Sequence, residues 1–194
     1  GRVSATIEAA AADAPMRVAD IGSPRAAQAV VDLAVRRYGR LDILINNAGI
    51  LGPRVPIVDY PVDDWDDVLR INLGGVFYLS RRAARRMAEQ RSGCIITLSS
   101  SVGRAGRGGW GAYAVSKFGV EGLSQVMADE LRSHGLCVLT FNPGGTRTKM
   151  RGNAYPSEDA STLRDPARVA EALLQVALAA LLALSRRALN FDDV

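Results

Sequence analysis

The sequence predicts an α/β protein with a doubly wound parallel sheet, and three observations lead to that fold class. Short runs of β-favouring apolar residues alternate with longer segments in which apolar residues recur at helical spacing. The short runs are nearly all apolar, as strands covered on both faces must be. Strands that alternate with helices form parallel sheets with right-handed crossovers, and ligands bind at the carboxyl ends of such strands.

Four strands are expected along the chain. They are residues 16–20 (MRVAD), 41–47 (LDILINN), 94–99 (CIITLS) and 136–141 (LCVLTF). The segment before the first strand, GRVSATIEAAAADAP, has the composition of the end of an Ala-rich or amphipathic helix. Helices are expected in the gaps between the strands and after the last one.

Each predicted helix has its own signal in the sequence. Ser23 followed by Pro24 marks the start of the first helix. The second begins near Asp63 and continues to about residue 90, with early acidic residues at the positive end of the helix dipole. The third covers about residues 111–131 and the fourth about residues 166–184.

The chain is long enough to bury one core, so a single domain over residues 1–194 is expected. Its 194 residues are 48% hydrophobic and 23% charged, which excludes the disordered class. The net charge is +4, but the Arg residues are spread along the chain among acidic residues. The one dense group is Arg81, Arg82, Arg85 and Arg86, which we interpret as a solvated helix face rather than a nucleic-acid site.

The remaining composition predicts a cytoplasmic protein without a metal site or a membrane segment. Cys94 and Cys137 lie inside apolar runs, as buried free thiols in a reducing compartment do. His134 is the only histidine, which argues against a His-based triad or metal site. The longest apolar run, residues 172–184, is shorter than the roughly 18 residues that cross a bilayer. No signal-peptide pattern opens the sequence.

The stretch WGAYAVSKFGVEGL, residues 110–123, holds the first candidate catalytic groups. Tyr113 and Lys117 are four residues apart, so on a helix their side chains share one face. A phenol has a pKa of about 10, and a nearby ammonium favours the phenolate and lowers that pKa. Only two of the 24 Lys and Arg residues are Lys, and a compact ammonium suits this task better than a guanidinium. An ordinary surface pair on a helix is the alternative.

Three further motifs follow predicted strands. Ser100 comes directly after the strand at residues 94–99, where its hydroxyl can meet the same substrate oxygen as the Tyr113 phenol. NNAG, residues 46–49, ends in a glycine that lets the backbone approach a ligand. NPGGTRT, residues 142–148, combines a turn with two hydroxyls. Each motif alone is also typical of a plain turn, but together they indicate one site.

Taken in order, these motifs resemble those of the short-chain dehydrogenase/reductase family. The set consists of NNAG, Asn72 within RINLGG, SSSVG at residues 99–103, Tyr113 with Lys117, and NPGGTRT. The resemblance covers roughly residues 16–166. Within the family, SSSVGRAGRGGWGAYAVSKF and NPGGTRTKMRGNAYPSED are similar to a bacterial branch, the YciK-like oxidoreductases.

The resemblance implies a Rossmann-like fold and an NAD(P)-dependent transfer of hydride between a nicotinamide cofactor and a carbonyl or secondary alcohol. It implies that Tyr113 is the general acid or base and that Lys117 lowers its pKa and binds the nicotinamide ribose. Ser100 would bind the reacting oxygen, and Asn72 would hold a water in a proton relay. The implied cofactor contacts, besides Tyr113 and Lys117, are Asp20, Ile21, Asn47, Ala48, Gly49, Pro143, Gly144, Thr146 and Thr148. The choice between NAD and NADP stays open.

The sequence departs from the family pattern at both ends. No glycine-rich turn follows a first strand, and in the family sheet order 3-2-1-4-5-6-7 the strand at residues 16–20 would be the third. A fold lacking the first two strands is therefore expected. The segment 16–20 would be unpaired, displaced or paired differently, or the chain is a fragment of a longer protein, which we favour. Near the other end, only residues 188–191 (ALNF) could form a last strand.

Two functional hypotheses remain at this point. The first is the oxidoreductase, acting on a small carbonyl or alcohol whose pocket is formed by residues 149–163 with Trp110, Met150 and Tyr155. The second is a non-catalytic binding or scaffold domain, or an inactive fragment, that lacks the glycine-rich cofactor loop. A homo-oligomer is also expected, in which the helices from Asp63 and Gly111 meet those of a second copy. Phe118, Val126 and Met127 are its candidate contacts.

Overall fold

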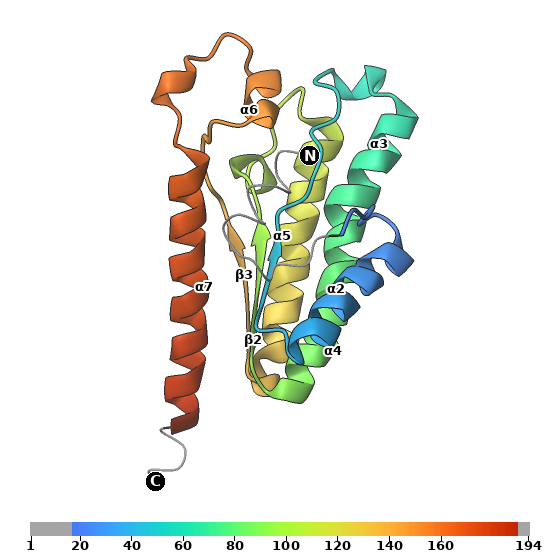
Figure 1. The fold of residues 1–194 in the computed structure, drawn as a ribbon. Coiled ribbons are helices and arrows are strands. Elements are labelled where there is room, and N and C mark those ends of the chain that lie inside the picture. The colour runs from blue at the N-terminus through green and yellow to red at the C-terminus, as the bar shows by residue number, and fades with distance from the viewer. Residues whose placement is uncertain (1–16, 190–194) are drawn as a thin grey trace.

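The computed structural model describes residues 17–189 and contains one parallel sheet between two layers of helices (Figure 1). The strands are β1 (Ile43–Asn46), β2 (Gly93–Leu98) and β3 (Leu136–Phe141), in the order β1-β2-β3. Helices α2, α4 and α5 cover one face, and α7 lies along the other. The predicted α/β class and the parallel sheet are confirmed.

The four predicted helices occur in the predicted order, but the second is divided into α3 and α4, and α6 was not predicted. They are α2 (Pro24–Tyr38), α3 (Val62–Leu69), α4 (Val76–Gln90), α5 (Gly111–Leu131), α6 (Lys149–Ala154) and α7 (Pro166–Leu189). Short 3-10 turns occur at η1 (Ile57–Asp59), η3 (Ser101–Gly103), η4 (Arg132–His134) and η5 (Ala160–Thr162). The predicted start of the first helix is confirmed, because the Ser23 side chain accepts a hydrogen bond from the Ala26 amide and Pro24 opens the helix.

The second predicted helix contains a feature that periodicity did not reveal. Between α3 and α4 the chain forms a π-helical turn, η2 (Arg70–Gly75), so residues 62–90 are helical but not uniformly α-helical. Such wide turns are rare and occur mostly at functional sites. Here the turn contains Asn72, which is one of the predicted site residues.

The strand predicted at residues 16–20 is absent from the part of the chain that the structure describes. Residues 17–20 are in no strand, and Val18 is fully exposed; Met16 lies outside the described residues. A strand needs a neighbour to accept and donate its backbone hydrogen bonds, and β1 pairs only with β2 among the described strands. The expectation of an unpaired segment is therefore met. At the other end α7 continues to Leu189, so the first half of ALNF is helical, and residues 190 and 191 lie outside the described part.

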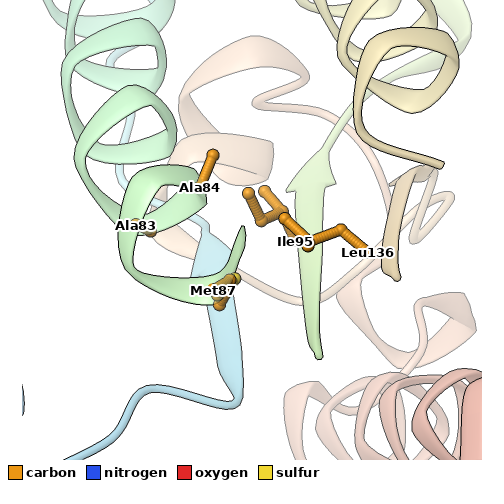
Figure 2. Close-up of a cluster of buried hydrophobic side chains, with 5 residues drawn as sticks. All are labelled: Ala83, Ala84, Met87, Ile95 and Leu136. Carbon is orange, nitrogen blue, oxygen red and sulfur yellow. The ribbon is translucent and has the colours of Figure 1, made fainter. Parts of the chain in front are cut away.

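The main core lies between α4 and the sheet (Figure 2). Met87, Ala83 and Ala84 of α4 contact Ile95 of β2 and Leu136 of β3. The two alanines let the helix approach the sheet, while Met87 fills the space over the start of β2 and is completely buried.

The central strand β2 is buried at every position, which explains its continuous apolar run. On its other face Cys94, Ile96 and Leu98 contact Leu173 and Ala177 of α7. Both cysteines of the chain are free, as predicted; Cys94 is buried and Cys137, its register partner on β3, is half-buried.

Helix α7 contains a longer apolar window than the run at residues 172–184 predicted. The window Pro166–Ala183, with a mean hydropathy of 1.5, is long and apolar enough to cross a membrane by length and composition. The expectation that no segment reaches that length is wrong. One such helix is by itself weak evidence of a membrane. Leu173 and Ala177 pack against the sheet, but only 11% of the window is buried.

Candidate active site

A cavity of about 630 Å³ lies at the carboxyl ends of the three strands, where the fold class predicts a ligand site. The predicted site residues that line it are Asn47, Ala48, Gly49, Ser100, Tyr113, Lys117, Pro143, Gly144, Thr146 and Thr148. Trp110 and Met150 of the predicted substrate region also line the cavity. Segments that are up to about 100 residues apart in sequence thus meet because parallel strands end at the same edge.

Tyr113 lies on the first turn of α5 and is half-buried. Burial raises its pKa above 10.0, and the hydrogen bond with the Ser100 side chain opposes this rise only in part. The prediction that the Lys117 ammonium lowers the pKa of Tyr113 is wrong in this structure. The ammonium lies 5.6 Å from the centre of the Tyr113 ring, and burial dominates. Tyr113 is therefore a protonated phenol at neutral pH.

Lys117 lies one helical turn after Tyr113 and is buried, with 8% of the residue exposed. Its Nζ donates a hydrogen bond to the carbonyl oxygen of Leu98 at 2.6 Å, at the end of β2. Burial lowers the pKa of Lys117 to about 8. Gly103 makes this close packing possible, because a Cβ there would lie 2.8 Å from the Cβ of Lys117. The site therefore holds a donor with a perturbed pKa beside a phenol, an arrangement typical of functional sites.

Asn72 is buried behind the cavity wall and does not line the cavity. Its Oδ1 accepts from the Ile50 amide at 2.8 Å, and its Nδ2 donates to the Ile50 carbonyl at 2.9 Å. Nδ2 also donates to Ser116 Oγ at 3.2 Å. A Cβ on Gly49 would lie 3.1 Å from Asn72 Oδ1, so the glycine allows the close approach. The side chain of Asn72 thus holds the loop after β1 against α5.

Asn46, the first residue of NNAG, points away from the cavity into the protein. Its Nδ2 donates to Ser80 Oγ at 2.9 Å and to Thr97 Oγ1 at 3.2 Å, which joins β1 to α4 and β2. Asn46 therefore fixes the strand end from which Asn47, Ala48 and Gly49 reach the cavity.

Asp20 and Ile21 do not line the cavity with the other predicted cofactor residues. Asp20 forms an ion pair with Arg70 at 2.7 Å and accepts from the Gly22 amide at 2.9 Å. The hydrogen bond from Arg70 is the main reason that the pKa of Asp20 is lowered. Ile21 packs against Gly75, where a Cβ would lie 2.8 Å from its Cδ1. The structure therefore places these two residues beside η2.

An aromatic and cationic stack lies beside the cavity, which Trp110, Tyr113 and Arg151 line. The ring of Trp110 lies 5.7 Å from that of Tyr113 and 5.8 Å from that of Tyr155, centre to centre. The Arg54 guanidinium lies 4.3 Å above the Trp110 ring, and Arg151 lies 4.0 Å above the Tyr155 ring. Sequence reasoning found Trp110 and Tyr155 but missed both arginines, since each reaches its ring only through the tertiary fold.

The charge of Arg151 is matched within the same wall. Its Nε and Nη2 donate to the two carboxylate oxygens of Glu158 at 2.6 and 2.5 Å. Bidentate pairs of this kind are strong and oriented. The charge of Arg151 is therefore balanced by Glu158, whereas Arg54 donates to the backbone carbonyls of Gly109 and Ala154.

The residues at the cavity fit the nicotinamide half of an NAD(P) molecule. The ammonium of Lys117 and the hydroxyls of Thr146 and Thr148 suit ribose hydroxyls and phosphate oxygens, and apolar walls suit a nicotinamide ring. Within residues 17–189, no group of His, Cys, Asp and Glu side chains could hold a metal ion.

The fold and the cavity define an α/β protein with a ligand site at its strand ends, and comparison with known proteins assigns the family. The family described as short chain dehydrogenase matches residues 2–159, so the chain belongs to the short-chain dehydrogenase family. The resemblance to the YciK-like branch is confirmed as well: the Escherichia coli oxidoreductase YciK is 44% identical over 132 residues, 68% of this chain and 52% of that protein.

Two further relatives have informative names. The 3-oxoacyl-[acyl-carrier-protein] reductase FabG of Escherichia coli is 36% identical over 131 residues, 68% of this chain and 53% of that protein. A short-chain dehydrogenase of Escherichia coli CFT073, crystallised with NADPH, is 35% identical with a TM-score of 0.82 and covers 91% of this chain and 74% of its own. The chain thus spans about half the length of the curated relatives it matches.

Proposed function

We propose that the protein is an NAD(P)-dependent oxidoreductase that interconverts a small carbonyl compound and the corresponding secondary alcohol. The observation that carries the proposal is the meeting of Ser100, Tyr113 and Lys117 in one cavity at the strand ends. Family membership and the relative crystallised with NADPH support it.

In carbonyl reduction, the Tyr113 phenol donates a proton to the substrate oxygen, and Ser100 hydrogen-bonds the same oxygen. The raised pKa of Tyr113 supports this direction, because the phenol keeps its proton at neutral pH. In alcohol oxidation Tyr113 acts as the base, which requires the phenolate. Oxidation is therefore expected to speed up as the pH rises toward the pKa of Tyr113, while reduction does not.

The nicotinamide group supplies or accepts the hydride when it is bound. Lys117 would bind the ribose hydroxyls, and Thr146 and Thr148 would contact the phosphates. The nicotinamide ring would be enclosed by Asn47, Ala48, Gly49, Pro143 and Gly144. Asp20 and Ile21 would lie toward the adenine. Asn72 would support a water molecule indirectly, because it holds the loop after β1 in place at Ile50. Either NAD or NADP is compatible with these residues, and the NADPH-bound relative favours the phosphorylated form.

The experiment that tests the proposal measures NADPH and NADH oxidation with a panel of ketones and aldehydes. Tyr113→Phe is expected to lower turnover by about 100-fold or more, because it removes the proton donor. Tyr78→Phe is the matched control, since Tyr78 packs in the core cluster beside α2 and does not line the cavity. Equal turnover of Tyr113→Phe and the unaltered protein would remove the assigned role.

A non-catalytic binding or scaffold domain, or an inactive fragment, is the second candidate. It is favoured by the position of Asp20 and Ile21 outside the cavity. Calorimetry with NADPH and NADH separates the two readings. Binding without turnover of any carbonyl in the panel supports the binding domain, and turnover that depends on Tyr113 supports the enzyme.

We further propose a homodimer formed through α4 and α5. Phe77 of α4 and Val115, Phe118 and Val126 of α5 are all 44% to 55% exposed, which is unusual for such apolar side chains. Met127, the third predicted contact, is half-buried and packs against the core on one side, so its role at the interface stays a prediction. A Phe118→Glu variant should shift the mass measured by light scattering from dimer to monomer, and a monomeric unaltered protein would refute the dimer.

Partners and location follow from the same features. The cavity suits a small, largely apolar carbonyl or alcohol. No nucleic-acid partner is proposed, because Arg82 and Arg86 of the arginine-rich helix face form ion pairs with carboxylates of the protein itself. Two free thiols are consistent with a reducing, cytoplasmic location, where we propose that the protein works without a membrane.

A further inference from the structure

Glu121 lies on the face of α5 that carries Tyr113 and Lys117. It follows Lys117 by four residues and Tyr113 by eight, so the three side chains lie on one side of the helix. The Glu121 side chain is only 14% exposed. A carboxylate so far withdrawn from water needs hydrogen-bond donors in place of its hydration shell.

Three donors from three segments converge on this carboxylate. Ser99 Oγ donates to it at 2.6 Å and Thr140 Oγ1 at 2.9 Å, so it joins the ends of β2 and β3. Arg104 Nε, from the loop after η3, donates at 3.0 Å. We call Glu121, Ser99, Thr140 and Arg104 the Glu121 clamp.

The clamp and Lys117 hold consecutive residues at the end of β2. Lys117 Nζ donates to the carbonyl of Leu98, and the next residue, Ser99, donates to Glu121. The residue after that is Ser100, whose side chain lines the cavity. These two contacts therefore help to fix the position of Ser100 relative to α5, together with the hydrogen bonds of the Ser100 hydroxyl with Tyr113 and the Val102 amide.

The ionisation of Glu121 suits this role. Burial alone would raise the pKa of Glu121, but the hydrogen bonds from Ser99, Thr140 and Arg104 outweigh it and hold the pKa below its ordinary value. At neutral pH the side chain is a carboxylate that accepts from all three donors. An apolar replacement would leave the hydroxyls of the buried Ser99 and the half-buried Thr140 without their acceptor.

We propose that Glu121 is a positioning residue, which sets the Ser100 hydroxyl against the Tyr113 phenol by tying the ends of β2 and β3 to α5. The proposal rests on the proposed function, in which Ser100 and Tyr113 meet the reacting oxygen. Glu121 does not line the cavity, so it acts through Ser99 and not on the substrate.

The test compares three variants of the full chain: Glu121→Ala, Glu121→Gln and Glu130→Ala. Gln keeps the size of the side chain and one acceptor oxygen, and the hydroxyls of Ser99 and Thr140 can rotate to accept from its amide. Glu130 is an exposed acid on the same helix, so its variant controls for the loss of one negative charge.

Hydrogen exchange gives a readout that does not depend on activity. The Ser99 amide donates to the Phe141 carbonyl at 2.8 Å, next to the clamp. In Glu121→Ala this amide is expected to exchange about 10-fold faster or more, while the amides of Ile95 and Ile96 in the middle of β2 keep their protection. Glu121→Gln should exchange at nearly the original rate, and Glu130→Ala at the original rate.

The titration of Lys117 reports on the site itself. Carbon-13 NMR of labelled lysine resolves two residues only, Lys117 and the exposed Lys149, which serves as the reference. Burial is what lowers the pKa of Lys117 to about 8. Loosening of the β2 end should therefore raise its titration midpoint by about half a pH unit or more in Glu121→Ala, and not in Glu130→Ala.

Steady-state kinetics complete the test. In NADPH-linked reduction, Glu121→Ala is expected to lower kcat by about 10-fold or more with KM within about twofold, and Glu121→Gln should recover most of kcat. Faster exchange along the whole of β2, or unchanged Ser99 exchange with an unchanged Lys117 midpoint, would overturn the proposal. If the unaltered protein shows no turnover, the proposed function fails, while exchange and the Lys117 titration still decide the role of Glu121.

Discussion

Replacing Lys117 with methionine should stabilise the fold at neutral pH, although the residue is central to the proposed activity. The Lys117 ammonium is buried and donates to the Leu98 carbonyl at 2.6 Å. Burial lowers its pKa from an ordinary value of 10.5 to about 8. Since burial disfavours the charged form, the protonated side chain weighs against the folded state.

The magnitude follows from the pKa values in the two states. The difference between 10.5 and about 8 corresponds to about 3 kcal/mol, at about 1.36 kcal/mol for each pKa unit. Methionine removes this cost but leaves the Leu98 carbonyl without its donor, which costs about 1–2 kcal/mol. The net gain expected for Lys117→Met at pH 7 is therefore about 1–2 kcal/mol.

The pH dependence has a definite sign. Below pH 8 Lys117 is protonated in both the folded and unfolded states, so the full cost is present. Between pH 8 and 10.5 the folded state releases the proton while the unfolded state keeps it, so the stability of the unaltered protein rises with pH. The advantage of Lys117→Met should shrink across this window and then reverse.

Urea unfolding followed by circular dichroism at pH 7, 8, 9 and 10 measures this difference. Lys149→Met is the matched control, because Lys149 is exposed and its replacement removes the same charge. A difference between Lys117→Met and the unaltered protein that stays constant from pH 7 to 10 would refute the reasoning, as would the same pH dependence in Lys149→Met.

Three other substitutions test the packing of the core and of the η2 turn. Met87→Ala opens a cavity between α4 and β2 and should lower the free energy of unfolding by about 2–5 kcal/mol, whereas the exposed Arg85→Ala should change it by less than about 0.5 kcal/mol. Urea unfolding separates them, and similar values for both would contradict the packing in Figure 2. Gly93→Ala places a Cβ 2.5 Å from Cγ and Sδ of Met87 and should destabilise by about 1–3 kcal/mol; a neutral effect would show that Met87 moves freely. Asn72→Ala removes the hydrogen bonds to Ile50 and should cost about 2–3 kcal/mol, with faster hydrogen exchange at the Ile50 amide; unchanged exchange there would disprove the contact.

Much of the site was predictable because its signals are local. Tyr113 and Lys117 share a helix face through their spacing alone, and Ser100 follows a strand whose apolar run marks its end. The pKa of Tyr113 was not predictable, because the sequence shows a neighbouring ammonium but not the burial that outweighs it. The π-helical turn that contains Asn72 was not predictable either, because it leaves no trace in the apolar pattern.

By itself the sequence determined the order of strands and helices, the parallel sheet and the edge at which a ligand binds, since periodicity and strand ends depend on neighbouring residues. Only the tertiary structure decided that residues 17–20 form no strand, because a strand depends on a partner that may lie anywhere in the chain. It also decided that Arg54 covers Trp110 and that Glu121 joins Ser99 to Thr140. These contacts join residues 19 to 56 positions apart, and only packing of the helices on the sheet brings them within hydrogen-bonding or stacking distance.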